Sequence, residues 1–311
     1  MPAVNDTKSP PAVFLLTGIP ELEDVHVWIS IPICLMYITS ILGNSVILFI
    51  IKTDPSLHQP MYILLSMLAI TDLDLSISTM PTILGIFWFK SREISHNACF
   101  AQLYFIHSLT VTESAILMSM AFDRFVAICY PLRYASILTP PRIAKMGLMC
   151  PLRAVCLILP LPILLKHFVY CQVNVLSHSY CLNQEVMKMA CSDIRAHSIY
   201  SFFITVASVG LDFLLIVLSY VLILKAVLSI ASHRERLKAL NTCISHICVV
   251  LLFYTPVIGL SVIHRFVKIS SPLVPSVMGD IYLLIPPLMN PIVYSVKTKP
   301  IRARILKVFF K

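Results

Sequence analysis

Apolar residues gather into seven long runs along the chain, separated by short polar segments. Each run has about 20 residues or more, which is the length that an α-helix needs to cross the hydrocarbon core of a bilayer. Because no water is available there, the backbone groups of such a run must bond to one another, so we predict that each run is helical. The predicted spanning helices are Val27–Ile51, Met61–Trp88, Phe100–Ile128, Ile143–Leu165, Ile199–Ile230, Leu240–Ile263 and Leu273–Val296.

Composition supports a membrane protein. Of the 311 residues, 58% are hydrophobic and only 13% are charged, whereas charged residues make up about 25% of a soluble domain. A soluble bundle of buried helices is the alternative, but too few polar segments remain to cover it. No interval between the runs can hold a further domain, so we predict one all-α domain over 1–311. It consists of an N-terminal segment (1–26), a seven-helix bundle (27–296) and a tail (297–311).

The tail has the pattern of a short amphipathic helix. Ile301, Ile305, Val308 and Phe309 recur at helical spacing, and lysine and arginine residues occupy the opposite side. A helix of this kind lies in the plane of a membrane surface. We therefore predict that 297–311 rests on the inner face of the bilayer.

The distribution of basic residues predicts the orientation of the bundle. With the N-terminus outside, the inner segments and tail contain 15 of the 24 lysines and arginines, the outer segments contain eight, and Arg153 lies within the fourth run. Cytoplasmic loops carry this excess in membrane proteins. The net charge of +9 therefore suits anionic lipid headgroups and gives no reason to expect nucleic acid as a partner. We predict a multi-pass protein of the plasma membrane with an extracellular N-terminus.

The first 20 residues have no basic segment followed by a long apolar one, so we expect no cleavable signal peptide. Asn5 begins an Asn-Asp-Thr sequon in the segment that is predicted to lie outside, and it is a candidate glycosylation site.

Four of the ten cysteines, Cys99, Cys171, Cys181 and Cys191, fall in or next to the predicted outer segments. On the oxidising side of a membrane, four cysteines favour two disulfides, and their spacing alone leaves three pairings open. A zinc site is the alternative, but no CxxC or HxxxH pattern supports it.

Five motifs in order along the chain closely resemble those of odorant receptors, which belong to the rhodopsin-like G-protein-coupled receptors. They are GN at 43–44, LHQPMYILLSMLAITDL at 57–73, MAFDRFVAICYPLRY at 120–134, KALNTCISHICVVLLFY at 238–254 and PPLMNPIVYSVKTKPIR at 286–302. The resemblance covers essentially the whole chain. Short inner loops, the cysteine-rich outer loop and GLSVIHRF at 259–266 extend it to the class I, fish-like, subfamily.

The resemblance implies a receptor and not an enzyme. Its partners would be a small odorant and a stimulatory, olfactory-type heterotrimeric G protein that raises cyclic AMP. It also implies the disulfides Cys99–Cys181 and Cys171–Cys191.

By the same resemblance, Asp123 holds Arg124 in the inactive state, and Tyr220 and Tyr294 are inner partners of Arg124 after its release. The alternative is an arginine that only extends towards the headgroups. Tyr254 belongs to the FYTP segment, which stands where many rhodopsin-like receptors have a Cys-Trp-x-Pro switch. Phenylalanine replaces two tyrosines of the usual family motif, at 122 and 125.

Asp72 and Glu113 are carboxylates at membrane depth, which costs roughly 2.5–3.5 kcal/mol on insertion scales and usually serves a function. The resemblance implies that Asn44 and Asn290 converge on them. Two nearby carboxylates do not both stay ionised unless a cation lies between them. We therefore predict a bound sodium ion or a shared proton that restrains the inactive state, with a hydrogen-bonded core that lacks an ion as the alternative. No other cofactor is expected. For the remaining polar residues within spans we expect only packing or pairing: Asp74, Arg153 and Asp212.

The sixth run ends in polar residues that suggest a site for an anion. With 3.6 residues per turn, Ser261 and Arg265 share nearly one face, and His264 lies about 100° from Arg265. His107 is at comparable depth on the third helix, and a Cys99–Cys181 disulfide would bring Gln184 over the same space. Such groups bind a carboxylate through strong charge-assisted hydrogen bonds. The class I resemblance implies short and medium carboxylic acids as ligands. Candidate wall residues for the ligand's apolar tail are Val111, Ile158, Leu161 and Thr205.

Several alternatives stay open at this point. Arg265 would be a simple interface anchor, or would pair with Asp280, in a receptor for neutral odorants. A carboxylate transporter would use the same groups, but no internal repeat is visible and transporter folds are often built from repeats. An intramembrane enzyme would have only Asp72 and Glu113 as its acid pair.

Overall fold

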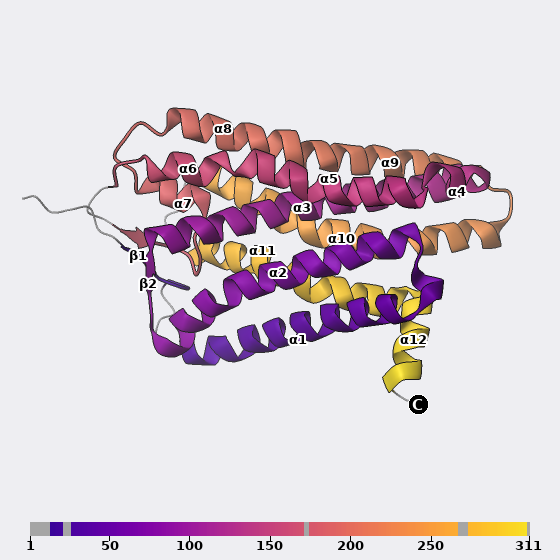
Figure 1. Ribbon diagram of the computed structural model, residues 1–311, viewed down its shortest axis with the longest axis horizontal. Coiled ribbons are helices and arrows are strands. Elements are labelled where there is room, and N and C mark those ends of the chain that lie inside the picture. The colour runs from indigo at the N-terminus through magenta and orange to yellow at the C-terminus, as the bar shows by residue number, and fades with distance from the viewer. Residues whose placement is uncertain (1–12, 21–25, 171–173, 267–272, 310–311) are drawn as a thin grey trace, which may run out of the picture.

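The computed structural model describes residues 13–20, 26–170, 174–266 and 273–309 (Figure 1). Within these ranges, seven helices are long and apolar enough to cross a membrane, which confirms the predicted bundle. They are α1 (His26–Thr53), α2 (Pro60–Phe89), α3 (His96–Cys129), α5 with α6 (Pro140–Ile158, Pro160–Lys166), α8 with α9 (Arg195–Thr205, Leu211–Leu228), α10 (His233–Phe266) and α11 (Leu273–Lys297). The shorter helical elements are η2 (Pro55–Leu57), η3 (Pro131–Arg133), α4 (Tyr134–Ile137), α7 (Asn183–Lys188) and α12 (Lys299–Phe309).

Two of the predicted continuous helices are interrupted. The fourth divides at Leu159, because Pro160 has no N–H to donate and begins a new helix instead. The fifth contains a π-helical turn at Val206–Gly210, between α8 and α9. Such turns are frequent at functional sites, and this one directly precedes the buried Asp212.

The bundle is organised around α3. In the apolar stretch of α3, 72% of the residues are buried, against 22% in the fifth spanning helix. Leu214, Val221 and Leu228 of α9 are all more than half exposed, as expected for side chains that face lipid. Because α3 is central, the polar side chains that it carries face the interior of the protein.

A small three-stranded sheet that the sequence did not predict covers one end of the bundle. Its central strand β1 (Val13–Leu16) pairs antiparallel with β2 (Glu93–Ser95) and parallel with β3 (Val175–Leu176). Phe14 of β1 is fully buried and packs against the rings of His96 and Tyr170. We call this end the sheet end, and the opposite end, which carries α12, the α12 end.

Two further features stabilise the sheet end of the bundle. Cys99 at the start of α3 and Cys181 form the predicted disulfide. Gly279 of α11 packs so closely that a Cβ there would lie 2.8 Å from the Tyr180 hydroxyl and 2.9 Å from the His178 ring. Cys191 is also disulfide-bonded, but its predicted partner Cys171 lies outside the described residues, as does Asn5.

The predicted amphipathic tail helix is present as α12. Ile301 is fully buried, and Arg304 lies 3.5 Å from the Asp54 carboxylate beside η2. Asp54 also accepts hydrogen bonds from the backbone N–H and the hydroxyl of Ser56, at 3.0 and 2.7 Å. These bonds lower the pKa of the Asp54 carboxyl, and Arg304 and Lys307 lower it further. The helix is thereby attached to the bundle by one buried side chain and one ion pair.

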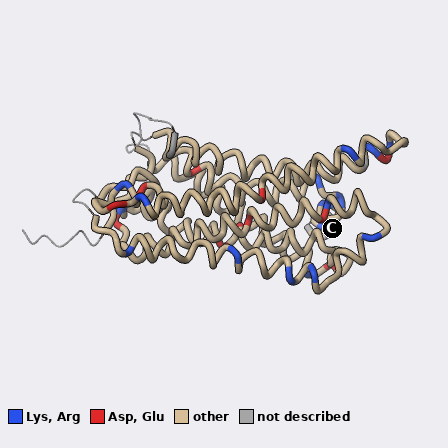
Figure 2. Tube along the Cα trace, turned by 90° about the horizontal axis from the view of Figure 1, so that it is seen from above, with Lys and Arg blue, Asp and Glu red and all other residues tan. Residues whose placement is uncertain are grey.

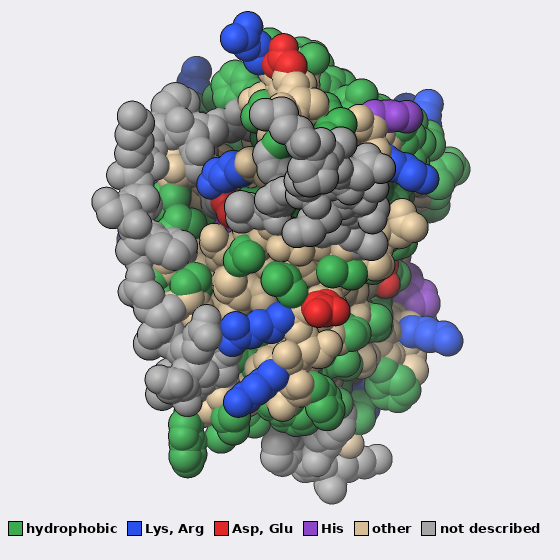
Figure 3. Space-filling model, turned by 90° about the vertical axis from the view of Figure 1, so that its left-hand side faces the viewer, with side chains coloured by type: hydrophobic (Ala, Val, Ile, Leu, Met, Phe, Trp, Pro, Cys, Tyr) green, Lys and Arg blue, Asp and Glu red, His purple; other side chains and the backbone are tan. Residues whose placement is uncertain are grey.

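Charges lie mainly at the two ends of the bundle, with fewer acidic and basic positions along its middle (Figure 2). Seen from the sheet end, the described surface carries lysine, arginine and acidic side chains scattered among hydrophobic ones (Figure 3). The charged residues within the middle of the bundle are therefore the ones that need an explanation.

Candidate functional site

A cavity with about 640 Å³ of space between its atoms lies in the sheet-end half of the bundle. None of its described lining side chains carries a permanent charge. The cavity is lined by His107, Thr110, Val111, Ile158, Leu161, Leu182, Asn183, Gln184, Ser201, Ile204, Thr205, Ser208, Val209, Val257, Leu260, Ser261 and Tyr282.

Seven of the eight candidate ligand residues line this one cavity. The eighth, Arg265, follows Ser261 by four residues on α10, but its side chain lies outside the described part of the structure. The same holds for His264. That any of these residues contacts a ligand stays a prediction.

The disulfide positions one wall of the cavity. Cys181 is held at α3 both by its bond to Cys99 and by its N–H, which donates to the Gln102 Oε1 atom at 3.0 Å. Gln184 follows three residues later, at the start of α7. This arrangement brings Gln184 over the same space as His107, as the sequence predicted.

Two buried polar atoms of lining residues have no hydrogen-bond partner within the described part of the chain. They are the Nε2 atom of His107 and the Oε1 atom of Gln184. A buried polar atom without a partner costs about 1–3 kcal/mol. The cavity is therefore suited to a ligand with a polar group at this position.

Sequence reasoning missed Asn183, which lines the cavity beside Gln184. Its carbonyl oxygen contacts the His197 Nε2 atom at 2.9 Å, and its amide donates to the Ser201 hydroxyl at 3.0 Å. These two bonds fix the amide against α8. Adjacency to Gln184 was the only signal in the sequence that pointed to it.

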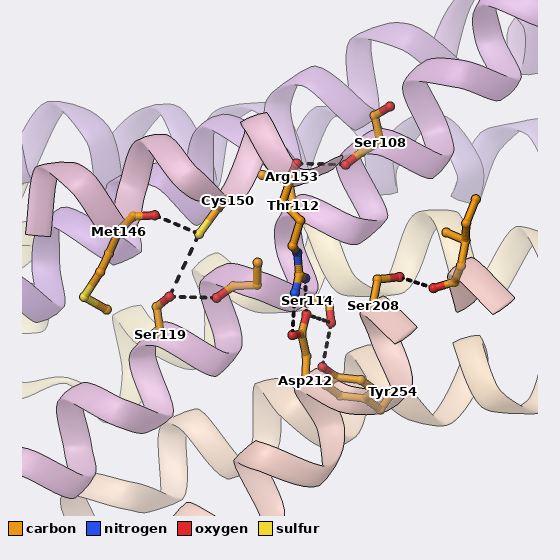
Figure 4. A network of polar contacts seen from close by, with 12 residues as sticks. Ser108, Thr112, Ser114, Ser119, Met146, Cys150, Arg153, Ser208, Asp212 and Tyr254 are labelled. Atoms are coloured by element: carbon orange, nitrogen blue, oxygen red, sulfur yellow. Dashed lines mark hydrogen bonds and ion pairs between the residues drawn. The ribbon is translucent and has the colours of Figure 1, made fainter. Parts of the chain in front are cut away.

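A buried ionic network lies one turn further into the bundle (Figure 4). Arg153 of α5 forms a two-pronged ion pair with Asp212 of α9, and the Nη1–Oδ1 distance is 2.8 Å. Ser114 of α3 donates to Asp212 at 2.9 Å and lies 2.8 Å from the hydroxyl of Tyr254 on α10. Four helices are thus joined through polar side chains. The structure confirms pairing as the role of Arg153 and Asp212, and the joining of Tyr254 to them was not predicted.

The carboxylates Asp72 and Glu113 meet at Asn290. The Asn290 amide donates to both oxygens of Asp72, at 3.2 and 3.0 Å, and to Glu113 at 3.4 Å. Within the described chain, the Oδ1 atom of Asn290 has no hydrogen-bond partner. Asn44 lies against the same helix as Asn290, because its amide donates to the backbone carbonyls of Ser40 and of Pro287 on α11.

At the α12 end, Asp123 binds Arg124 through the Nη2 atom at 2.7 Å and the Nε atom at 3.1 Å. Tyr134 of α4 donates to the same carboxylate at 2.7 Å. Burial raises the pKa of the Tyr134 hydroxyl, and the Asp123 charge raises it further. Sequence reasoning missed Tyr134, although it closes the motif at 120–134.

The two tyrosines predicted as later partners of Arg124 are engaged elsewhere. The Tyr220 hydroxyl lies 2.6 Å from the Nδ1 atom of His246, and the Tyr294 hydroxyl lies 4.0 Å from the sulfur of Met120. The Arg124 guanidinium is thus held by Asp123, and that this contact marks the inactive state stays a prediction.

Comparison with known proteins now decides the family. The family model described as "Olfactory receptor" matches residues 33–311. The chain belongs to the olfactory receptor family. It is 65% identical to human Olfactory receptor 51G2 over 98% of the chain and 97% of that protein. It is 59% identical to human Olfactory receptor 51G1, over 96% and 93%, and 49% identical to human Olfactory receptor 51E1, over 98% and 96%.

As a member of this family, the protein is a multi-pass membrane receptor for small odorants with a G protein as its partner, and it is not an enzyme. The class I assignment made from the sequence fits these relatives. The transporter and enzyme alternatives are thereby set aside.

Proposed function

We propose that this olfactory receptor binds short and medium carboxylic acids in the cavity between α3, α7, α8 and α10. The observation that supports this most is the unpartnered Nε2 atom of His107 on the wall of the cavity, which donates to a carboxylate in one tautomer of the ring. The unpartnered Oε1 atom of Gln184 only accepts hydrogen bonds, so it suits the hydroxyl of a protonated acid. Ser261 lines the same cavity, and four residues of helix turn Arg265 only about 40° from it. An acid would place its carboxylate among these groups and its chain against Val111 and its apolar neighbours.

The energetics of such a ligand are those of a weak sensor. Hydrogen bonds to a charged group contribute about 1.5–3 kcal/mol each, and each buried methylene contributes about 0.8 kcal/mol. After the cost of association, the dissociation constant falls in the micromolar to millimolar range. Each missing methylene then weakens the response roughly fourfold.

A cyclic-AMP reporter assay across linear acids and the matching alcohols tests the proposal. We expect acids to activate the receptor and alcohols of the same length to be much weaker. Arg265→Ala should abolish the acid response at normal surface expression. Arg195→Ala is the matched control, because that arginine is 89% exposed at the same end. An unchanged dose response in Arg265→Ala would remove Arg265 from the site.

Neutral odorants are the second candidate ligands, because no described lining residue is permanently charged. In that case alcohols would equal or exceed the acids, and Arg265→Ala would leave the responses unchanged. The same assay therefore separates the two candidates.

We propose that the G protein is of the stimulatory, olfactory type. A ligand that binds better to the active arrangement shifts the population towards it, and release of Arg124 from Asp123 and Tyr134 would be part of this shift. Tyr134→Phe removes one of the contacts that hold Asp123, so it should raise cyclic AMP in the absence of ligand. A basal level equal to wild type would contradict this role.

Asp72, Glu113 and Asn290 are proposed to hold a sodium ion or a shared proton in the inactive receptor. Asp72 and Glu113 are 0% and 2% exposed, and the unpartnered Asn290 oxygen adds a ligand of the kind that hard cations prefer. If sodium binds, raising its concentration should shift the acid dose response to higher ligand concentration, and Glu113→Gln should remove the shift. A response independent of sodium would favour the proton.

The sheet end is proposed to face the outside of the plasma membrane. The Cys99–Cys181 disulfide lies at this end, as expected for the oxidising side. An N-terminal epitope should be accessible to antibody on intact cells, and Asn5→Gln should remove a glycosidase-sensitive mass difference. An epitope that is reached only after permeabilisation would reverse the orientation.

A further inference from the structure

One wall of the cavity belongs to a chain of three hydrogen-bonded side chains that begins behind it. Asn183 and Ser201 line the cavity, whereas His197 does not. The His197 Nε2 atom lies 2.9 Å from the Asn183 Oδ1 atom, and the Asn183 amide donates to the Ser201 hydroxyl at 3.0 Å. His197 and Ser201 are four residues apart on α8 and share one face of it, and Asn183 of α7 bridges them. We call these three residues the α7–α8 relay.

The relay is shielded from solvent. Its three residues are all buried, and the ring of Phe168 packs edge-on against the His197 ring, with 5.5 Å between the centroids. The Nδ1 atom of His197 has no hydrogen-bond partner within the described ranges. The orientation of the His197 ring is therefore set by packing and by its contact with Asn183.

The chemistry of these groups fixes the direction in which hydrogens are donated. An amide oxygen only accepts, so the Nε2 atom of His197 carries a hydrogen and donates it to Asn183. The amide nitrogen of Asn183 then donates to Ser201, which leaves the hydrogen of the Ser201 hydroxyl unused. A reversed amide would accept that hydrogen, but it would require the other tautomer of His197, whose Nδ1 hydrogen would be buried without an acceptor in the described chain. His197 therefore determines whether Ser201 offers a hydrogen to the cavity.

Ser201 differs from the other hydroxyls on the same side of the cavity. Thr205 donates to the backbone carbonyl of Ser201 at 2.9 Å, and Ser208 donates to that of Ile204 at 2.6 Å (Figure 4). Both hydroxyls are thus engaged one turn back along the chain. No acceptor in the described part of the structure binds the hydrogen of the Ser201 hydroxyl, which only accepts in its bond with Asn183. An acceptor on the ligand would complete this side of the cavity.

We propose that His197 is a positioning residue for ligand specificity. Through Asn183 it keeps the Ser201 hydroxyl as a donor, so that the cavity selects acids whose chain carries a carbonyl oxygen. This inference rests on the proposed function, which assigns the acid head to groups on α3, α7 and α10 and leaves the α8 donor for a second oxygen.

The expected ligand class is therefore the linear keto acids. A carbonyl oxygen accepts without donating, so it pairs with the Ser201 hydroxyl and brings no hydrogen of its own. A methylene at the same place leaves the donor unpaired. A hydroxyl brings a second hydrogen, which would itself need an acceptor.

The test compares each keto acid with the plain acid of the same chain length in the cyclic-AMP reporter assay, with the carbonyl moved along the chain one carbon at a time. At the best position of the carbonyl, the keto acid should be the more potent ligand of wild type. His197→Phe keeps a ring against Phe168 but removes the donor, so the potency ratio of keto acid to plain acid should fall about fivefold, which corresponds to about 1 kcal/mol. His197→Gln supplies an amide N–H in place of the ring N–H and should retain the ratio.

Ser201→Ala provides an independent variant, because it removes the donor itself by a small change. It should lower the ratio by the same factor, and adding His197→Phe should lower it no further, since both changes act through one hydrogen bond. A merely structural role of His197 would weaken both ligands alike and leave the ratio unchanged. Ile199→Ala is the control, because Ile199 of α8 is 69% exposed and does not line the cavity.

An unchanged ratio in Ser201→Ala, or in His197→Phe that reaches the cell surface, overturns the proposal. So does a wild-type receptor that prefers the plain acid at every position of the carbonyl. Where His197→Phe is not expressed, the ratio in Ser201→Ala decides. Failure of the proposed function gives a different result, because no acid would then activate any variant. The relay would in that case be judged by the same ratios between keto alcohols and plain alcohols.

Discussion

The ion pair between Arg153 and Asp212 makes a quantitative prediction, because its two members differ in burial. The Asp212 side chain is 1% exposed and the Arg153 side chain is 28% exposed. Removing one partner of a buried pair costs about 3–5 kcal/mol, since the remaining charge is left without compensation. The residual arginine of Asp212→Leu has a long, flexible side chain that can reach other acceptors, whereas the short residual carboxylate of Arg153→Met cannot move to another donor.

We therefore expect Arg153→Met to destabilise the receptor by about 3–5 kcal/mol and Asp212→Leu to destabilise it less. The double variant should recover most of the loss, because replacing both charges by apolar groups is often nearly neutral. Ser114 would still bond to Tyr254 in all three variants, whereas its bond to Asp212 is lost in both variants that carry Asp212→Leu.

Thermal unfolding of the purified variants, together with their surface expression, measures this double-mutant cycle. Leu214→Ala is a matched control on the same helix, because Leu214 is 65% exposed to lipid. The reasoning is refuted if the double variant is as unstable as Arg153→Met. It is equally refuted if Asp212→Leu proves to be the more damaging single change.

Three further predictions follow from contacts at the two ends. Cys99→Ser opens a disulfide that joins residues 82 apart, so we expect a loss of about 4–5 kcal/mol and a fall in surface expression that reducing agent reproduces in the wild type. Gly279→Ala should lower the free energy of unfolding by about 1–3 kcal/mol, because its Cβ would clash with the side chains of Tyr180 and His178. Gly259→Ala is the control and should be tolerated, because its Cβ would meet only the flexible end of Met278 at 3.0 Å. Equal surface expression of the two variants would contradict this. The lowered pKa of the Asp54 carboxyl means that its contact with Arg304 is present at neutral pH and is lost only as the pH falls through that lowered value, below the ordinary range of a carboxyl. The protection of the α12 amides, which is their exchange rate relative to the intrinsic rate at each pH, should be constant from about pH 6 to 8, and Asp54→Asn should lower this protection at neutral pH.

The bundle was predictable because each spanning helix is specified locally by its own apolar run. The length of the run fixes the helix, and the bilayer excludes other solutions. The breaks within the fourth and fifth spanning helices were harder to predict from the sequence. Pro160 is visible in the sequence, but no local pattern encodes the π-helical turn at Val206–Gly210.

The lining residues of the cavity were predictable where sequence motifs placed them at the same depth in the membrane. His107, Gln184 and Ser261 came from three different segments, and the Cys99–Cys181 disulfide related Gln184 to His107. The sequence did not predict the roles of Asn183 and Tyr134, because their hydrogen-bond partners come close only in the folded chain. The partners of Asn44 were not predictable for a similar reason, since its amide donates to two backbone carbonyls, one of them on α11.

The small sheet at the sheet end has a consequence for the order of assembly. Val13–Leu16 leaves the ribosome first, yet its two partner strands begin at Glu93 and Val175, so it waits until most of the bundle has been made. Contacts between such distant segments form late, because a large loop must close before they add stability. A receptor halted part-way through synthesis would therefore expose Phe14 and its neighbours, and this apolar segment would then be open to chaperones that survey unfinished membrane proteins.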